Sequence, residues 1–156
     1  MKGHIFTSLG LMIMPIFLLG CLTINQQSKV KIQQGIQGQI FELKGNLMPQ
    51  KGKPLPVGIG FASQIYIFEP TTLQSAVQVS GHIFQMPETK LIASFATDSL
   101  GKFKVQLKPG KYSVFVSYQN GYYAASFNQL NELGIVEVLS GTFAHLEVII
   151  SAKASY

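Results

Sequence analysis

Two alternating runs joined by turn residues occupy residues 97–118, TDSLGKFKVQLKPGKYSVFVSY, and they constrain the fold more than any other part of the chain. Apolar and polar residues alternate from Phe103 to Leu107, and the same period of two returns from Tyr112 to Tyr118. This period places successive side chains on opposite faces of a strand. Asp98, Gly101 and Pro109-Gly110 are typical turn residues. The stretch therefore predicts antiparallel β structure.

Short runs of β-forming residues recur along the rest of the chain, without a convincing helix. Together with the first two runs they predict seven or eight closely spaced strands, which is typical of a β-sandwich with one core. Residues 61–69 have apolar side chains on both parities, so this strand should either be covered on both faces or present an aromatic outer face. Further strands are expected at residues 36–44, 91–97, 122–127, 135–139 and 143–151.

The connections between these strands differ in their turn chemistry. Residues 45–60 are rich in proline and glycine, which predicts a long exposed loop. Residues 70–90 are irregular and are interpreted as an insertion with a short hairpin around Ser80-Gly81. Asn120-Gly121 is the strongest hairpin signal, because both residues tolerate the positive φ of a type I′ turn. Residues 128–134 predict a polar loop.

The N-terminus has the layout of an export signal. Residues 1–20 contain one lysine and an apolar run that is too short to span a bilayer, and they end at the only cysteine, Cys21. Gly20-Cys21 resembles the lipobox of bacterial lipoproteins, which implies cleavage of the signal peptide and lipidation of Cys21. Residues 21–35 would then be a polar tether, and the absence of an acidic residue at Leu22 implies the outer membrane. The alternative is a buried free cysteine in an apolar helix.

Charge and cysteine content exclude two classes of protein. The formal net charge is +5, and the scattered basic residues are all lysines, so a nucleic-acid partner is not expected. With one cysteine, no intrachain disulfide can form. An exported form must therefore be stabilised by its core alone.

The turn residues and strands of the first stretch resemble a family signature. The pattern T-D-x-x-G-x-F followed by L-x-P-G-x-Y-x-V, typical of carboxypeptidase regulatory-like or transthyretin-like domains, is matched by Thr97, Asp98, Gly101, Phe103, Leu107, Pro109, Gly110, Tyr112 and Val114. The likeness covers residues 36–151, before a C-terminal tail at 152–156, and the GNLMP loop is similar to that of small Bacteroidetes lipoproteins. It implies an all-β Greek-key sandwich in which Pro109-Gly110 is a corner between opposite sheets, so that Val105 and Val114 meet across the core.

No catalytic or metal-binding constellation accompanies this signature. Enzymes of this fold that hydrolyse 5-hydroxyisourate use Arg residues and a C-terminal Tyr-Arg-Gly-Ser motif, and this chain has neither. His82 and His145 lack companions at the spacing of zinc ligands. We therefore expect no catalytic residue, no metal and no cofactor.

A binding surface is the stronger expectation. If successive strands alternate in direction, the 70–90 insertion, the Pro109 turn and the 128–134 loop meet at one end of the sandwich, and such loops commonly bind partners. The candidate binding residues are His82, Phe84, Met86, Lys108, Lys111 and Asn131. An open alternative is that Phe84 and Met86 cap the core. A second candidate, with core packing as its alternative, is an aromatic face for glycan or protein contact formed by Tyr66, Tyr118, Tyr122 and Tyr123.

These observations predict a non-enzymatic protein of the cell envelope, anchored to the membrane by acyl chains, whose sandwich binds an unknown envelope protein or glycan or acts as a structural module. Binding requires an exposed apolar patch at the insertion end. One alternative is a carrier of a small apolar ligand, which requires an enclosed cavity of roughly 300 Å³ or more. A remoter alternative is an uncharacterised hydrolase.

Overall fold

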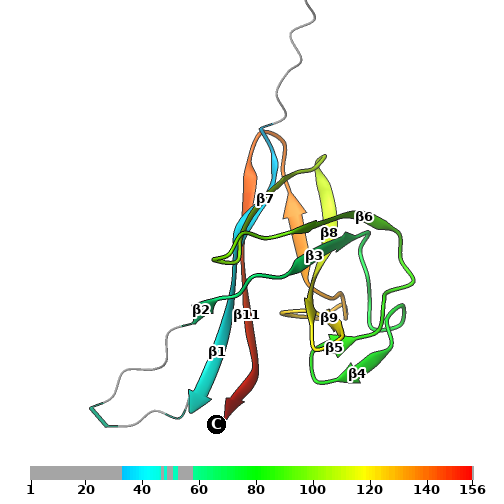
Figure 1. The fold of residues 1–156 in the computed structure, drawn as a ribbon. Helices are drawn as coiled ribbons and strands as arrows, with labels where there is room; N and C mark the ends of the chain where they lie inside the picture. Colours follow the sequence, from blue (N-terminus) through cyan, green and yellow to red (C-terminus); the bar gives the residue numbers. More distant parts are fainter. Residues whose placement is uncertain (1–32, 47, 49–50, 53–57, 156) are drawn as a thin grey trace, which may run out of the picture. The chain divides into compact units, whose positions relative to one another are not determined.

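The computed structural model of the chain describes residues 33–46, 48, 51–52 and 58–155. The expected signal peptide, Cys21 and nearly all of the tether lie outside these residues, as does half of the expected loop at 45–60. Among the described residues no helix is long and apolar enough to cross a membrane. They form eleven strands (Figure 1): β1 (Gly35–Asn46), β2 (Ile59–Gly60), β3 (Gln64–Phe68), β4 (Gln78–Ser80), β5 (Ile83–Phe84), β6 (Leu91–Ala96), β7 (Lys102–Gln106), β8 (Gly110–Tyr118), β9 (Gly121–Tyr123), β10 (Ile135–Val138) and β11 (Phe143–Ser155).

Two sheets, of four and seven strands, pack as a sandwich, which confirms the predicted all-β class. In the smaller sheet β1 pairs in parallel with β11, and its other edge pairs antiparallel with β7 and β2. In the larger sheet β8 pairs with β3 on one side and with β9 and β10 on the other. Beyond β3 lies β6, and beyond β9 lie β5 and β4.

The eight expected strands are present, and three further short ones were not counted among them. β2 ends the expected loop, whereas β4 and β5 form the hairpin of the 70–90 insertion and extend the larger sheet. The last strand is also longer than expected, because β11 continues to Ser155 through most of the expected tail.

The Pro109 turn is a corner, as the family resemblance implies. β7 pairs with β1 in the four-stranded sheet, whereas β8 lies in the seven-stranded sheet. Phe103 and Val114 are both buried in the core between the sheets, and Val105 and Tyr112 pack against it. A simple hairpin would have made β7 and β8 neighbours in one sheet, so the expectation of a corner is confirmed.

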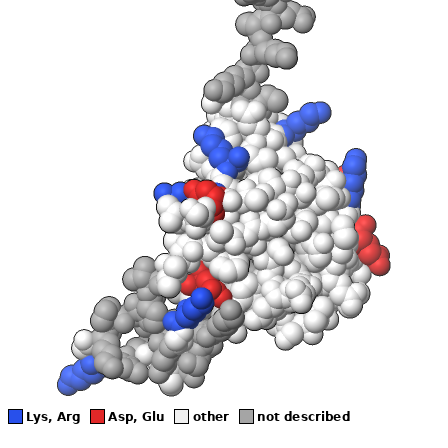
Figure 2. All heavy atoms as spheres, viewed as in Figure 1, with Lys and Arg blue, Asp and Glu red and all other residues white. Residues whose placement is uncertain are grey.

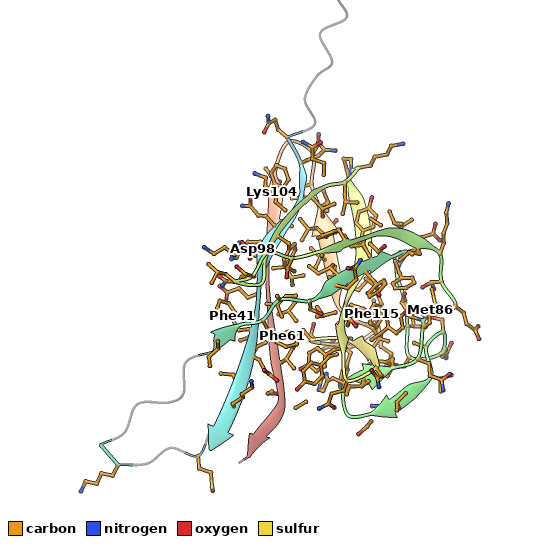
Figure 3. The ribbon with its side chains drawn as sticks, viewed as in Figure 1. Phe41, Phe61, Met86, Asp98, Lys104 and Phe115 are labelled. Atoms are coloured by element: carbon orange, nitrogen blue, oxygen red, sulfur yellow. The ribbon has the colours of Figure 1, made fainter. Side chains whose placement is uncertain are left out.

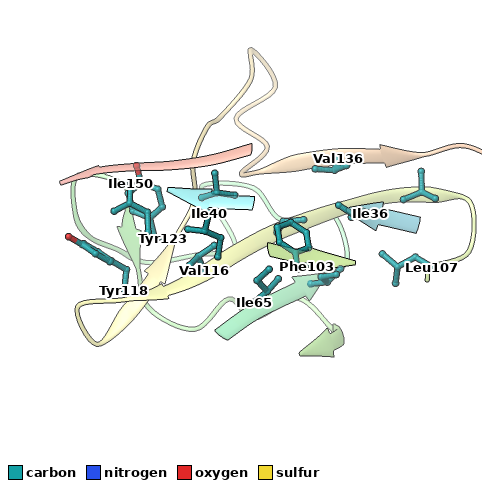
Figure 4. Packing of buried hydrophobic residues seen from close by; sticks show 14 of the residues in the cluster. Ile36, Ile40, Ile65, Phe103, Leu107, Val116, Tyr118, Tyr123, Val136 and Ile150 are labelled. Carbon is teal, nitrogen blue, oxygen red and sulfur yellow. The ribbon is translucent and has the colours of Figure 1, made fainter. Parts of the chain in front are cut away.

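The main core fills the space between the two sheets (Figure 4). Ile36 and Ile40 enter it from β1, and Ile65 and Ile67 enter it from β3. All four side chains are fully buried, and burial of each contributes roughly 2–3 kcal/mol to stability. The remaining members that are buried are Ile83, Phe103, Leu107, Val114, Val116, Tyr118, Tyr123, Val136, Val138, Val148 and Ile150.

A second apolar cluster lies on the other face of β3 and β8, although the sequence predicted one core. Phe68 and Phe115 pack edge to face with ring centroids 5.6 Å apart. The insertion contributes Ala76 and Phe84 to this cluster, and the segment after β9 contributes Ala124 and Leu133. The prediction that residues 61–69 form a strand covered on both faces is therefore confirmed.

The hairpin between β8 and β9 is present, but its turn lies one residue earlier than predicted. Tyr118 pairs with Gly121, and the two turn residues with positive φ are Gln119 (48°) and Asn120 (61°). Gly121 serves a different purpose, because a Cβ there would lie 2.4 Å from Cγ2 of Ile83. Its missing side chain lets β5 approach the hairpin.

Two five-residue loops, 98–102 and 128–132, share one set of hydrogen bonds. In the second loop Asn128 Oδ1 accepts the N–H groups of Leu130 (2.9 Å) and Glu132 (3.1 Å), while Asn128 O accepts that of Asn131 (3.0 Å). Asp98 makes the equivalent bonds in the first loop. Each loop has a positive φ at its fourth residue and exposes the leucine at its third. Leu130 is thus held on an ordered loop.

Candidate functional site

The fold brings together two stretches that contain no charged residue. Residues 70–87 and 112–131 include no Lys, Arg, Asp or Glu. They are joined where β5 pairs with β9, where Leu73 N–H donates to Asn131 O (3.0 Å) and where His82 contacts Ala124. Figure 2 shows no charged side chain over β4, β5 and β9 in this view. We call the surface formed by residues 70–87 and 119–131 the uncharged lobe.

Large apolar side chains are exposed on the uncharged lobe. Leu130 is 70% exposed, the highest fraction among the large hydrophobic residues of the described part. Single exposed apolar residues are ordinary on protein surfaces, whereas a larger apolar patch is typical of an interaction site. The Glu132 carboxylate, which accepts from Asn128 Nδ2 (2.7 Å), borders the lobe beside Leu130. The group consists of Leu73, Val77, Val79, Met86, Phe127 and Leu130.

A pocket of about 230 Å³ opens at the edge of the uncharged lobe. Its walls are residues 80–83 around the β4–β5 turn, Gln119, Tyr123 and the Ser151-Ala152 segment of β11. The His82 ring lies between two aromatic rings, with centroids 5.8 Å from Tyr123 and 6.0 Å from Phe127. None of the lining residues is charged.

His82, which lines this pocket, has a tautomer that its hydrogen bond defines. Its Nδ1 lies 3.0 Å from Ala124 O, and a carbonyl oxygen only accepts, so Nδ1 carries the hydrogen. In the neutral ring Nε2 is then an acceptor. The sequence pointed to His82 as a candidate residue. It did not point to Gln119, Ser80 or Ser151, because these three residues come from separate turns and strands. The feature of the sequence that could have indicated this site is the absence of charged residues from both stretches.

The candidate residues from the sequence divide into three groups. His82, Met86 and Asn131 are exposed on the uncharged lobe, and Figure 3 shows Met86 on the side of the fold opposite Lys104. Phe84 is only 2% exposed and belongs to the second apolar cluster, so its place on a binding surface was wrong and the core-capping alternative holds. Lys108 and Lys111 are exposed at the corner.

The corner and the uncharged lobe do not share one end of the sandwich, contrary to expectation. Figure 4 shows Leu107 at one end of the core and Tyr118 and Tyr123 at the other. Lys111 pairs with Glu137 near the start of β8, whereas Val116 pairs with Tyr123 beside the lobe. Five residues of strand separate the two points, about 17 Å at 3.3 Å per residue. The insertion runs back along the sheet to reach β9, which the alternation of strands did not reveal.

The predicted aromatic face is divided between core and surface. Tyr118 and Tyr123 are each 4% exposed and lie in the main core, so core packing was the correct alternative for them. Tyr66 and Tyr122 are half-buried and pack edge to face with centroids 4.9 Å apart. Burial raises the pKa of the Tyr122 hydroxyl, and the neighbouring Tyr66 raises it further.

Tyr118 belongs to a buried polar group at the lobe end of the core. Its hydroxyl donates to Glu42 Oε1 (3.1 Å), and Lys44 Nζ lies 2.8 Å from Glu42 Oε2. Glu42 is 4% exposed, so its carboxylate depends on these partners. Burial raises the pKa of Tyr118, and the hydrogen bond to Glu42 adds to this rise.

The outer face of the four-stranded sheet offers two other cavities. One of about 290 Å³ is lined by polar side chains of mixed charge, including Gln39, Lys104, His145 and Glu147. The other, about 180 Å³, is lined by Phe41, Leu43, Gly58 and Ile149. His145 pairs with Glu147 at 3.6 Å. Within the described ranges no three His, Cys, Asp or Glu residues are grouped so that they could hold a metal ion.

Comparison with known proteins identifies no relative of this chain. No family model, no curated protein and no solved structure matches the chain. The site must therefore be interpreted from its own geometry.

Proposed function

We propose that the chain is a non-enzymatic, lipid-anchored protein of the cell envelope, most directly the outer membrane, and that it binds its partner through the uncharged lobe. The carrying observation is the group of exposed apolar side chains on two stretches that lack charge. Burial of such side chains in an interface releases hydration water without removing a charge from solvent. The partner is an envelope protein or a glycan.

The ordered loop around Leu130 supports a role in binding. Asn128 holds this loop through both its side chain and its backbone, so Leu130 loses little conformational freedom when a partner covers it. Phe127 directly precedes this loop in the sequence and is also exposed. Aromatic residues and methionine are enriched in protein interfaces, and Phe127 and Met86 provide both on the lobe.

The carrier alternative finds no similar support. Fully buried side chains such as Ile40, Ile65 and Val116 fill the space between the sheets. The three cavities described above measure about 290, 230 and 180 Å³, each below the roughly 300 Å³ that a carrier requires. The binding function is the better explanation of the described surface.

Lipidation is tested by mass spectrometry of the protein extracted from membranes. The resemblance of Gly20-Cys21 to a lipobox predicts a mature chain that begins at Cys21 with acyl chains attached. An unmodified Cys21 in the mature chain would contradict the anchor.

Binding through the lobe is tested by site-specific photo-crosslinking in intact cells. A photoreactive residue at Leu130 or Val79 is expected to give a discrete adduct, whereas the same residue at Leu139 is not. Leu139 is a matched control, because it is also apolar and exposed but lies outside the lobe. Equal adducts at all three positions, or none at Leu130 and Val79, would refute the lobe as the docking surface.

A further inference from the structure

We propose that the pocket beside His82 binds one neutral, polyhydroxylated ring, that is, a single pyranose unit, either a free sugar or the end of a glycan. This inference rests on the proposed binding function and names the ligand class of one part of the lobe. Three observations support it: several uncharged polar residues line the pocket, none of the lining residues is charged, and the backbone of Gln119 has a positive φ angle.

Uncharged polar residues line the pocket from three separate segments. Ser80 comes from the β4–β5 hairpin, Gln119 from the β8–β9 turn and Ser151 from β11. No described residue makes a hydrogen bond to any of these three side chains, and Nε2 of His82 is likewise without a described partner. Hydroxyl, amide and imidazole groups together provide donors and acceptors for a ring with several hydroxyls.

Charge and size narrow the ligand further. A charged ligand would leave water without meeting a counter-ion among the lining residues, which is costly. The volume of about 230 Å³ lies below the range of roughly 300–1,000 Å³ that is usual for drug-sized ligands. A single ring is therefore the appropriate size. The apolar C–H face of a pyranose suits the aromatic rings of His82 and Tyr123, which both line the pocket with centroids 5.8 Å apart.

The backbone conformation of Gln119 is independent evidence that its side chain has a function in binding. With φ of 48° it occupies the left-handed region, where glycine and asparagine are preferred at a type I′ turn and glutamine is not. The need of Gly121 to lie against Ile83 explains the position of the turn. It does not explain why glutamine stands at 119. Strain of this kind persists where a side chain has a function.

Two substitutions in the same turn separate binding from stability. Gln119→Gly relieves the left-handed angle of a glutamine and is expected to raise the midpoint of thermal unfolding by about 3 °C, whereas Asn120→Gly exchanges two residues that both tolerate this angle and should leave the midpoint nearly unchanged. Only Gln119 lines the pocket. Sugar binding should therefore weaken at least about tenfold in Gln119→Gly, the loss of one or two hydrogen bonds, and stay unchanged in Asn120→Gly.

The probes are glucose, galactose, mannose and N-acetylglucosamine, added to the purified full chain and followed by NMR chemical shifts. We expect saturable shifts at His82 and Gln119, and at least about tenfold weaker binding of glucuronate and glucosamine, which add a charge to the same ring. Methyl glycosides that bind as well as the free sugars identify a glycan end, and a preference for reducing sugars identifies a free monosaccharide.

Three results would overturn the inference: no saturable shift with any neutral sugar, equal binding of glucuronate, or full binding by Gln119→Gly. If these occur while the crosslinks at Leu130 persist, the sugar site fails and the proposed function stands. If sugars bind but the crosslinks are absent, the docking surface for a larger partner fails and the sugar site stands.

Discussion

Gly101 and Gly141 both have positive φ angles, 77° and 76°, yet their surroundings differ. A Cβ at Gly101 would lie 2.6 Å from Ile40 O and 2.7 Å from Phe61 O, whereas no atom lies within 4 Å at Gly141. Gly101 O also accepts the N–H of Ile40 (2.9 Å). The bare Cα of Gly101 thus lets the loop before β7 approach β1, while Gly141 is needed only for its backbone angle.

Alanine at these two positions should separate backbone strain from steric collision. Gly141→Ala is expected to lower the free energy of unfolding by about 1 kcal/mol, the cost of a left-handed angle. Gly101→Ala adds a collision with two carbonyl groups and should cost about 3 kcal/mol or more. Urea unfolding of the two variants measures the difference. Equal losses would show that the Gly101 loop has room to move.

Tyr118 predicts how stability depends on alkaline pH. Its pKa is raised above the ordinary value of about 10, so the protonated hydroxyl stabilises the folded state below pH 10, and this contribution is lost as pH rises through the folded-state pKa. Tyr118→Phe should cost about 1 kcal/mol at pH 7, because Glu42 Oε1 loses its donor. Thermal unfolding between pH 8 and 12 should show a smaller difference between the two proteins as pH rises; a constant difference would exclude the linkage.

For single residues, the sequence predicted which ones favour a turn or a strand, but it did not predict which tertiary contacts they make. Asn120-Gly121 predicted the hairpin, but the turn residues are Gln119 and Asn120, and Gly121 instead makes room for Ile83, a residue from the insertion. Glu42 lies on the same face of β1 as Ile36 and Ile40, and no local pattern shows that its carboxylate meets Tyr118. These contacts depend on which strands become neighbours.

Among the elements, the insertion and its second apolar cluster decide where the uncharged lobe lies. Thr71 fastens the start of the insertion: its N–H donates to Ser113 Oγ (2.8 Å), and its carbonyl accepts the N–H of Leu133 (2.8 Å). Both Thr71 and Ser113 are fully buried. The insertion is therefore docked on β8 by a polar contact as well as by the packing of Phe84 and Phe115.

Removal of the Ser113 hydroxyl should loosen this docking. Ser113→Ala leaves the buried N–H of Thr71 without its acceptor, which is expected to cost about 1–3 kcal/mol. Hydrogen exchange should become faster in residues 70–87 than in β1 and β11. Ser117→Ala, on the same face of β8, is the control and should change stability by less than about 0.5 kcal/mol. Uniformly faster exchange would mean that the insertion is not a separate unit.

Strand alternation predicted eight of the eleven described strands, although β9 ends at Tyr123 and not at Phe127, and the family resemblance was needed for the corner at Pro109. The second cluster was visible only in part, as apolar residues on both parities of residues 61–69. The route of the insertion to β9 was not visible at all, because β4 and β5 are two or three residues long and carry little pattern of their own. The candidate site was missed for the same reason, apart from His82, Met86 and Asn131.

For the whole molecule, the proposed anchor and the charge distribution predict how the protein is held at the membrane. The formal net charge is +5, and its lysines are scattered along the sequence. Acyl chains contribute about 0.8 kcal/mol per buried CH₂ and are insensitive to salt, whereas surface charges are screened. The protein should stay in the membrane fraction after a 1 M salt wash, at which the Debye length is about 3 Å.

The control for this fractionation is a chain whose first 21 residues are replaced by a secretory signal without a lipidation site. It should be recovered in the soluble fraction at low salt. Release of the natural protein by salt alone, or retention of the control at low salt, would indicate attachment through charge or through the folded domain.

The parallel pairing of β1 with β11 also sets the order in which the chain can fold. β1 is the centre of its sheet, and its parallel partner β11 is formed by residues 143–155. Beside this pairing Gln34 accepts the N–H of Gly141, 107 residues away. Contacts of such long sequence separation make folding slow. An emerging chain therefore cannot complete its smaller sheet before residues 143–155 have left the ribosome, and the proposed export would act on a chain in which this sheet is still open.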